Sequence, residues 1–326
     1  MHAITISRFG DPDVLTEAEL PDPRPGPGQI AIDVTHAAVG MIDVIFRRGD
    51  HADDDRFPPP PFVPGIEVAG LVRELGAGVE QFRVGERVVT LSLVELGGYA
   101  TVALADAART VSLEGVDVET DQALASLPNA VTAHLALTHA VSIRGGETVL
   151  VHGATGGLAA AFPAVARALG AERLIGTVVA DAHVEAALAL GHDKVIRGDQ
   201  FPDGLDGEQV AIIVDPVGGE LRKASLDVLA PEGRLLIMGH ASPNPDQPFT
   251  GDDLWGRSVG ATGFVVGTFL QTDPTRAQPA LDAVSPLVAD GTISVPIQTL
   301  ALAQAAEAHR HLEARTNTGR LILATG

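Results

Sequence analysis

The fold of this chain is decided by residues 148–170, which read TVLVHGATGGLAAAFPAVARALG. The segment opens with Val149–Val151, a short apolar run whose length and β-branching are typical of a buried strand. Gly153, Gly156 and Gly157 follow at once, and an alanine-rich stretch with helix-forming composition comes after them. A strand, a tight glycine turn and a helix in this order aim backbone N–H groups and a positive helix end at a diphosphate. Residues 148–170 therefore predict a dinucleotide-binding turn.

Other residues of the same segment refine this prediction. The spacing is GxxGxxA, with Ala159 where a third glycine would let helix and strand pack closely. Pro163 is expected past the first turn of the helix, where it removes one backbone hydrogen bond and bends the helix. His152 ends the strand and is expected to be a buried histidine with satisfied hydrogen bonds. The competing interpretation is an ordinary glycine-rich turn between strand and helix.

Length and composition indicate a globular protein of two domains. The 326 residues are 45% hydrophobic and 20% charged. Residues 148–166 carry no formal charge, but their glycines, His152 and Pro163 argue against a membrane span. The N-terminus shows no secretory signal, and the absence of cysteine excludes disulfides and thiolate metal sites. A cytoplasmic location is expected.

The balance of charges limits the possible partners. The formal net charge is −20, from 42 acidic and 22 basic residues. A surface of this sign repels phosphate backbones and anionic lipids. Nucleic acid and membranes are therefore poor candidate partners, and a small-molecule substrate is expected.

Residues 1–120 have the pattern of a β-rich domain. Leu20–Gly28 is rich in Pro and Gly and is expected to be an extended surface connection, and Asp43–Arg48 is a plausible short helix with Asp43 as its cap. His51–Pro64, with three consecutive aspartates followed by four consecutive prolines at 58–61, is expected to be a solvated loop. The predicted strands are Ala3–Ser7, Gln29–Thr35, Val68–Leu75 and Arg87–Leu91.

From residue 121 to about 266, helical and strand patterns alternate. This spacing is typical of βαβ units and a parallel sheet. The predicted strands are Thr148–His152, Arg173–Val178, Lys194–Ile196, Val210–Val214 and Arg234–Met238. The predicted helices are Ala123–Thr138, interrupted at Pro128–Asn129, and Leu158–Leu169, His183–Leu190 and Glu220–Leu229.

The last part of the chain, from about residue 267 to 326, is expected to complete the first domain. It should contain a helix at Arg276–Ala289, a strand at Ile293–Val295, a helix at Ala303–Ala314 and a final strand at Arg320–Ala324. The predicted organisation is therefore a β-rich domain over 1–120 and 267–326, with an α/β domain over 121–266 inserted into it.

The motifs, taken in order, resemble a known family. The chain is similar nearly end to end to the zinc-free quinone oxidoreductase branch of the medium-chain dehydrogenase/reductase superfamily. This resemblance implies a GroES-like β-rich catalytic domain, a Rossmann domain with a doubly wound parallel sheet, and a cofactor in the cleft between them. It rests on AAVGMIDVIFRRG (37–49), PFVPGIEVAG (61–70), VGERV (84–88), GGYA (97–100), LPNAVTA (127–133), the glycine turn, DPVGG (215–219) and NTGRL (317–321).

Two positions in these motifs indicate chemistry without zinc. Zinc-dependent relatives carry a cysteine where this chain has Gly40, and a histidine where it has Ile66. Without a Lewis acid, the reaction should favour acceptors whose reduced form is a stabilised anion, such as quinones and activated enones. No metal site is expected.

Pattern and resemblance together give the candidate cofactor-binding residues. Thr132, Asn317 and Phe264–Val266 have simpler interpretations as a helix threonine, a turn and core packing. Asp215 is expected to be a turn residue. The candidates are Thr132, Gly153, Thr155, Gly156, Gly157, Leu158, Thr177, His183, Arg197, Gly239, His240, Phe264, Val266 and Asn317.

The substrate side of the site departs from the family pattern. Gly40 stands where the family usually has an asparagine, and Ile45 where a tyrosine is common. Tyr99 is the one tyrosine of the chain, and in the family this residue is mostly structural. Gly40, Ile45 and Tyr99 are the candidate substrate-pocket residues. No proton donor can be named, so the catalytic residues are unknown.

NADPH is favoured over NADH. An NAD enzyme places an acid at the end of the second strand of the sheet, but here Gly176–Val179 contains none and Asp181 is the first. The family's lysine for the 2′-phosphate of NADPH aligns with His183 and its tyrosine with Gly198, so neighbouring Arg197 is the candidate for that charge. NADH remains possible.

Three functions are therefore open. The first is an NADPH-dependent, metal-independent reductase of quinones or activated enones. The second is an enoyl or double-bond reductase of a biosynthetic pathway, and the third is a non-catalytic sensor that binds NAD(P)H. A homodimer joined through Gly260–Val266 is expected, and substrate specificity should lie in Asp53–Pro64 and Val94–Leu96.

Overall fold

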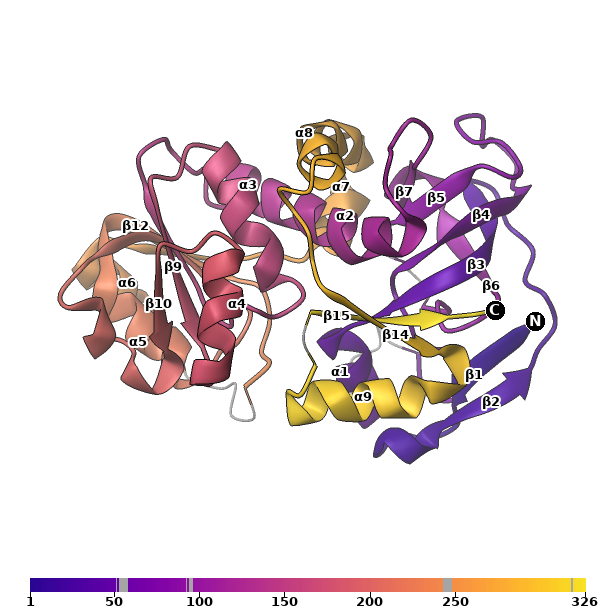
Figure 1. Ribbon diagram of the computed structural model, residues 1–326, viewed down its shortest axis with the longest axis horizontal. Coiled ribbons are helices and arrows are strands. Elements are labelled where there is room, and N and C mark those ends of the chain that lie inside the picture. The colour runs from indigo at the N-terminus through magenta and orange to yellow at the C-terminus, as the bar shows by residue number, and fades with distance from the viewer. Residues whose placement is uncertain (51, 53–57, 92, 94–95, 243–247, 318) are drawn as a thin grey trace. The chain divides into compact units, whose positions relative to one another are not determined.

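The computed structural model describes residues 1–50, 52, 58–91, 93, 96–242, 248–317 and 319–326. Residues 51, 53–57 and 94–95, which belong to the predicted loop and the predicted specificity segments, lie outside the described part. The chain divides into two compact units (Figure 1). Unit 1 contains Met1–Pro128 and Leu270–Gly326, and unit 2 contains Asn129–Phe269.

Unit 2 is built on a parallel sheet of six strands in the order β10-β9-β8-β11-β12-β13. The direction of winding reverses between β8 and β11, and ligands bind at such a point in open α/β sheets. The strands are β8 (Thr148–Val151), β9 (Arg173–Val178), β10 (Lys194–Arg197), β11 (Val210–Asp215), β12 (Leu229–Ile237) and β13 (Gly260–Gly263). The helices are α3 (Phe162–Ala168), α4 (Val184–Ala189), α5 (Glu220–Val228) and α6 (Gly251–Arg257).

Apolar side chains explain why these strands lie at the centre of unit 2. Leu150, Ile213 and Leu235 come from β8, β11 and β12 and are all fully buried in one hydrophobic cluster. Strands buried on both faces are near-continuous apolar runs, as β8 and β11 are. The predicted Rossmann sheet is therefore confirmed.

Unit 1 contains a seven-stranded sheet and a separate antiparallel pair of β1 (His2–Ile6) and β2 (Leu15–Glu19). In the larger sheet the order is β14-β15-β3-β4-β5-β7, and β6 pairs with β3. The strands are β3 (Gln29–Val39), β4 (Val68–Leu75), β5 (Arg87–Thr90), β6 (Val102–Asp106), β7 (Thr110–Ser112), β14 (Ile297–Ala301) and β15 (Arg320–Ala324). The helices are α1 (Met41–Arg48), α8 (Ala277–Ala289) and α9 (Ala305–Ala314), while α2 (Thr120–Leu135) and α7 (Val266–Thr272) each begin in one unit and end in the other.

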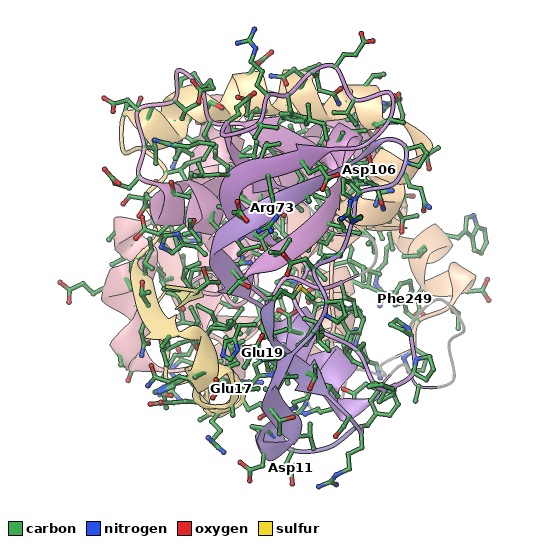
Figure 2. All side chains as sticks on the ribbon, turned by 90° about the vertical axis from the view of Figure 1, so that its right-hand side faces the viewer. Asp11, Glu17, Glu19, Arg73, Asp106 and Phe249 are labelled. Carbon is green, nitrogen blue, oxygen red and sulfur yellow. The ribbon has the colours of Figure 1, made fainter. Side chains whose placement is uncertain are left out.

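The larger sheet of unit 1 joins strands from the first and the last parts of the chain. β15 lies between β14 and β3, with Leu321 opposite Val39 and Leu323 opposite Ala37 (Figure 1). Leu321 and Leu323 are fully buried, so the last strand is part of the core. Arg73 of β4, labelled in Figure 2, is partly exposed and forms ion pairs with Asp22 and Asp33, at 2.7 and 2.8 Å.

Three details of the predicted elements are wrong. α2 continues through Pro128 without the expected interruption, and its neighbours Leu127 and Val131 are fully buried, so core packing outweighs the lost backbone bond. Pro163 does not lie past the first turn of the helix: it is the second residue of α3, within the first turn, where proline is tolerated. The strand predicted at Ile293–Val295 is absent from the described part, and β14 starts after Pro296 instead.

Candidate cofactor-binding site

The turn after β8 is closed by its own backbone. Gly153 has a φ of 62°, a conformation that side chains disfavour, and its carbonyl accepts a hydrogen bond from the Gly156 N–H at 2.8 Å. A Cβ on Gly156 would lie 3.1 Å from the Gly153 oxygen. The glycines at these two positions therefore allow a tight turn that larger residues would strain.

The same turn offers several backbone donors. Within the described part of the chain, the N–H groups of Thr155, Gly157 and Leu158 have no hydrogen-bond acceptor. Successive backbone N–H groups of this kind bind phosphate oxygens. The turn therefore fits the diphosphate of a dinucleotide.

The glycine turn is also held from its carbonyl side. Asn129, in α2, donates from Nδ2 to the Gly157 carbonyl at 2.9 Å. Asn129 and Thr132, one helical turn apart, are both buried in the part of α2 that belongs to unit 2. α2 therefore fixes the glycine turn through Asn129.

A buried ion pair links the ends of β11 and β12. The carboxylate of Asp215 is fully buried and accepts hydrogen bonds from the N–H groups of Val217 and Gly218, at 2.8 and 2.7 Å, and from Arg222 Nε at 2.5 Å. Arg222 also donates to the carbonyl of Gly239. A Cβ on Gly239 would lie 2.9 Å from the Pro216 carbonyl oxygen, so glycine is required where these segments meet.

The residues that are candidates to bind the ribose and the 2′-phosphate of the cofactor lie at or after the ends of β9 and β10. Thr177 is buried near the end of β9, and its hydroxyl lies 3.0 Å from His152 Nδ1. His183 ends a short 3-10 helix and is half-buried. Arg197 ends β10 and pairs with Asp199 and, at 3.6 Å, with Asp181. The side-chain hydrogen bond from Arg197 lowers the pKa of Asp199, so this carboxylate would compete with a phosphate for the guanidinium.

The remaining unit 2 candidates follow β12 and β13. Gly239 and His240 come directly after β12, and His240 is half-buried. Phe264 is buried, its N–H donates to the Ile237 carbonyl at 2.9 Å, and its ring centroid lies 5.2 Å from that of Phe269. Val266 begins α7. Phe264 thus packs in the core and also fixes the backbone beyond the sheet.

Two of the candidates in unit 1, Gly40 and Ile45, belong to the N-cap and the body of α1. Gly40 precedes α1, and its N–H donates to Asp43 Oδ2 at 2.8 Å, as expected if Asp43 caps the helix. Ile45 is buried in α1. Asn317 donates from Nδ2 to the Gly319 carbonyl at 2.9 Å, which is the geometry of a simple turn.

Tyr99 belongs to a buried polar cluster in unit 1. It is fully buried, and its hydroxyl lies 3.2 Å from His309 Nε2. Burial raises the pKa of Tyr99 well above 10, and the nearby carboxylate of Asp43 adds to this rise. Burial likewise raises the pKa of Asp43 to about 7. Both groups therefore retain their protons more strongly than exposed residues would.

Sequence and structure comparisons identify the family. The profile of the alcohol dehydrogenase GroES-like domain matches residues 26–115, and that of the zinc-binding dehydrogenase matches residues 190–323. A quinone oxidoreductase of Pseudomonas aeruginosa is 32% identical over 337 residues, and the match covers 98% of both chains. The chain belongs to the quinone oxidoreductase family of the medium-chain dehydrogenase/reductase superfamily. It is therefore an oxidoreductase, and the resemblance seen in its motifs is confirmed.

Other members of the family are similar over the same length. A 2-haloacrylate reductase of Burkholderia sp is 30% identical and is also matched over 98% of both chains. The crystal structure of Escherichia coli quinone oxidoreductase complexed with NADPH superposes with a TM-score of 0.89 at 27% identity, covering 100% of both chains. The similarity therefore extends through both units.

The positions that hold zinc in other members of the superfamily carry no ligand atoms here. Gly40 has no side chain and Ile66 has an aliphatic one. Among the residues that the structure describes, no three His, Asp or Glu side chains form a group that could hold a metal ion. Within the same described residues, no helix has the length and hydropathy to cross a bilayer.

Sequence reasoning missed two residues that shape the site of this family member. Asn129 lies in the LPNAVTA motif, which served only for the resemblance, and its contact with Gly157 depends on how α2 packs in unit 2. Arg222 gives no signal in the sequence, because its two partners, Asp215 and Gly239, meet only in the folded sheet.

Proposed function

We propose that the chain transfers a hydride from NADPH to a quinone or an activated enone without the help of a metal ion. The observation that carries this proposal is that the N–H groups of Thr155, Gly157 and Leu158 at the glycine turn have no partner among the residues that the structure describes. They lie beside the switch point of a parallel sheet, where a diphosphate binds. The full-length similarity to quinone oxidoreductases supports the reaction class.

The residues around the turn would hold the cofactor in specific ways. The backbone N–H groups bind the diphosphate, and Arg197 supplies the positive charge for the 2′-phosphate of NADPH. No acid ends β9, where an NAD enzyme needs one for the ribose hydroxyls. Thr132, His240, Phe264 and Val266 are the further residues of unit 2 that are proposed to contact the cofactor, and Asn317 is the one proposed from unit 1. When bound, NADPH supplies the hydride.

The acceptor must stabilise its own negative charge. Gly40 and Ile66 offer no metal ligand, and Tyr99 is fully buried and holds its proton tightly. The negative charge that develops on the acceptor is delocalised by its conjugated ring or enone system, or is met by backbone N–H groups and water. Gly40 and Ile45 lie on the proposed substrate side, where the chain lacks the side chains common in its family.

Two titrations followed by an acceptor screen test the proposal. Binding of NADPH and NADH is followed separately by fluorescence, and oxidation of the preferred cofactor is then measured with 1,4-benzoquinone, 9,10-phenanthrenequinone and a crotonyl thioester. We expect tighter binding of NADPH and turnover with the quinones, unchanged after treatment with EDTA. Absence of binding by either nucleotide would refute the proposal.

Two other outcomes would redirect the assignment. Faster turnover of the crotonyl thioester than of either quinone would favour a double-bond reductase, which the similarity to 2-haloacrylate reductase also supports. Tight NADPH binding without turnover of any acceptor would favour a sensor, in keeping with the replacement of the family's asparagine by Gly40.

We also propose a cytoplasmic homodimer. β13 is the last strand in the order of the unit 2 sheet, so its outer edge pairs with no strand in the described part of the chain. Pairing of two such edges would join two sheets, and Gly260–Val266 is the segment that would meet its copy. Light scattering of the purified protein tests this, and a monomer at micromolar concentration would contradict it.

A further inference from the structure

We propose that His152 is a positioning residue for the cofactor: its imidazole holds the first residues of the glycine turn against Thr177 of β9. The inference rests on the proposed function, because it assigns a role toward the same NADPH. His152 directly follows β8, is fully buried, and has both ring nitrogens within hydrogen-bond distance of hydroxyl groups.

The hydrogen bonds around His152 fix which nitrogen carries the proton. Ser225 Oγ donates its only hydrogen to the Leu221 carbonyl at 2.7 Å. Ser225 must therefore accept from His152 Nε2–H, at 2.8 Å. In the neutral ring Nδ1 is then the acceptor, and the Thr177 hydroxyl donates to it at 3.0 Å.

The surroundings keep the ring neutral. Burial lowers the pKa of His152 to about 4, against the opposing influence of Asp215, while Arg222 lowers it further. The ring of Phe201 covers the imidazole edge-on with centroids 4.9 Å apart. At physiological pH the imidazole therefore stays neutral, and each hydrogen bond that links Ser225, His152 and Thr177 keeps one direction.

This constant direction positions the turn. Because the Thr177 hydroxyl donates to His152, its oxygen is left to accept, and the Gly153 N–H points to it at 3.4 Å. The carbonyl of Thr177 accepts from the Ala154 N–H at 2.9 Å. Gly153 and Ala154 are thus both tied to one residue of β9, directly before the donors of Thr155, Gly157 and Leu158.

Variants of His152 separate positioning from simple core packing. His152→Leu removes the acceptor for Thr177, and we expect the NADPH Kd to rise about tenfold, as for the loss of one oriented hydrogen bond. His152→Asn keeps a side-chain oxygen near the position of Nδ1, so its Kd should stay within about threefold of the wild-type value. Fluorescence titration gives the Kd, and urea unfolding shows that each variant is folded.

Thr90→Val is the control for the loss of a buried hydroxyl outside this network. Thr90 lies in unit 1, is fully buried and accepts from the Val68 N–H at 2.9 Å, so Thr90→Val should lower the urea midpoint but leave the NADPH Kd within about twofold of wild type. An equal rise in Kd for Thr90→Val and His152→Leu would overturn the proposal, as would equal values for His152→Leu and His152→Asn.

A second variant covers the case in which His152→Leu does not fold. Thr177→Val keeps the shape of the side chain and deletes the hydroxyl, and the same rise of about tenfold in Kd is expected. A wild-type Kd for this variant would overturn the role of His152 even though NADPH binds. Failure of the wild-type protein to bind NADPH would instead refute the proposed function itself.

Discussion

The backbone conformation of the glycine turn depends on Gly153. Its φ is 62°, and a Cβ there would lie 3.2 Å from Val217 Cγ2. Gly153→Ala should cost about 1 kcal/mol of unfolding free energy. It should also weaken NADPH binding, because the neighbouring N–H groups shift with the backbone.

Gly78→Ala is the control for this prediction. Gly78 has a φ of 81° with nothing within 4 Å of an added Cβ, and it lies in unit 1. This variant should lose similar stability and keep the wild-type Kd for NADPH. Urea unfolding and fluorescence titration measure both quantities, and an unchanged Kd in Gly153→Ala would contradict the role of the turn.

Asp43 should make stability depend on pH. Burial raises its pKa from 3.8 to about 7, beside Glu67, Arg320 and Tyr99. Between these values the folded chain holds a proton that the unfolded chain has released, so this group lowers the unfolding free energy as pH rises.

Asp43→Asn removes that titration. The stability of the variant relative to wild type should therefore grow by about 1.4 kcal/mol per pH unit from about pH 4 to about pH 7, and then level off. Urea unfolding at pH 5, 6 and 7 measures this difference. Parallel curves for the two proteins would mean that Asp43 titrates as an exposed carboxyl does.

The sequence predicts candidate residues better than it predicts their partners. The spacing of Gly153, Gly156 and Gly157 marks the turn, because backbone conformation constrains glycine locally. The sequence predicts Arg197 as the positive charge for the 2′-phosphate of NADPH. Its pairing with Asp199 depends on side-chain rotamers, which no sequence pattern encodes. The sequence predicts that the hydrogen bonds of His152 are satisfied. It does not predict the partners, Thr177 of β9 and Ser225 of α5, because these follow only from the strand order of the sheet.

At the scale of elements, the guanidinium of Arg222 connects the end of β11 to the segment that follows β12. Arg222 is the cation beside the buried Asp215 and also binds the Gly239 carbonyl. Arg222→Met leaves the carboxylate buried with two amide donors, so the expected loss of unfolding free energy is on the order of 3 kcal/mol.

Arg257→Met provides the matched comparison in the same unit. Arg257 pairs with Asp227 at 2.8 Å, but both side chains are exposed, so its loss should cost less than about 1 kcal/mol. Urea unfolding of both variants tests the contrast. Equal losses would show that the burial of Asp215 does not determine the strength of its ion pair.

At the same scale, sequence patterns locate most strands and helices and fail at prolines. β4, β9 and β15 have the predicted bounds, because apolar runs flanked by turns are local signals. The predictions at Pro128 and Pro163 are wrong, since Pro128 is tolerated through core packing and the effect of Pro163 depends on where the helix begins. The apolar Ile293 and Val295 are buried without forming a strand.

Three buried histidines should govern the acid stability of the whole molecule. Burial lowers the pKa of His152 and His192 to about 4 and that of His309 to about 3, from 6.5. As pH falls below 6.5 the unfolded chain binds protons that the folded chain does not, so the unfolding free energy decreases.

His192→Leu isolates one of these contributions. In the described part of the chain neither ring nitrogen of His192 has a hydrogen-bond partner, so the substitution breaks no such bond. Between pH 6 and pH 5 the unfolding free energy of the variant should fall by about 1.4 kcal/mol less per pH unit than that of wild type. Urea midpoints across this range measure the slopes, and identical slopes would contradict the prediction.

The position of β15 between β14 and β3 has a consequence for synthesis of the protein. Asn129–Phe269 is one continuous stretch, whereas the sheet of unit 1 needs residues 29–39 and residues 297–324 together. During synthesis on the ribosome, the whole of unit 2 can fold before the last strand of the unit 1 sheet has been made. A nascent chain halted within α9, before β15 is made, should therefore resist protease over the inserted segment and remain cleavable in the N-terminal strands.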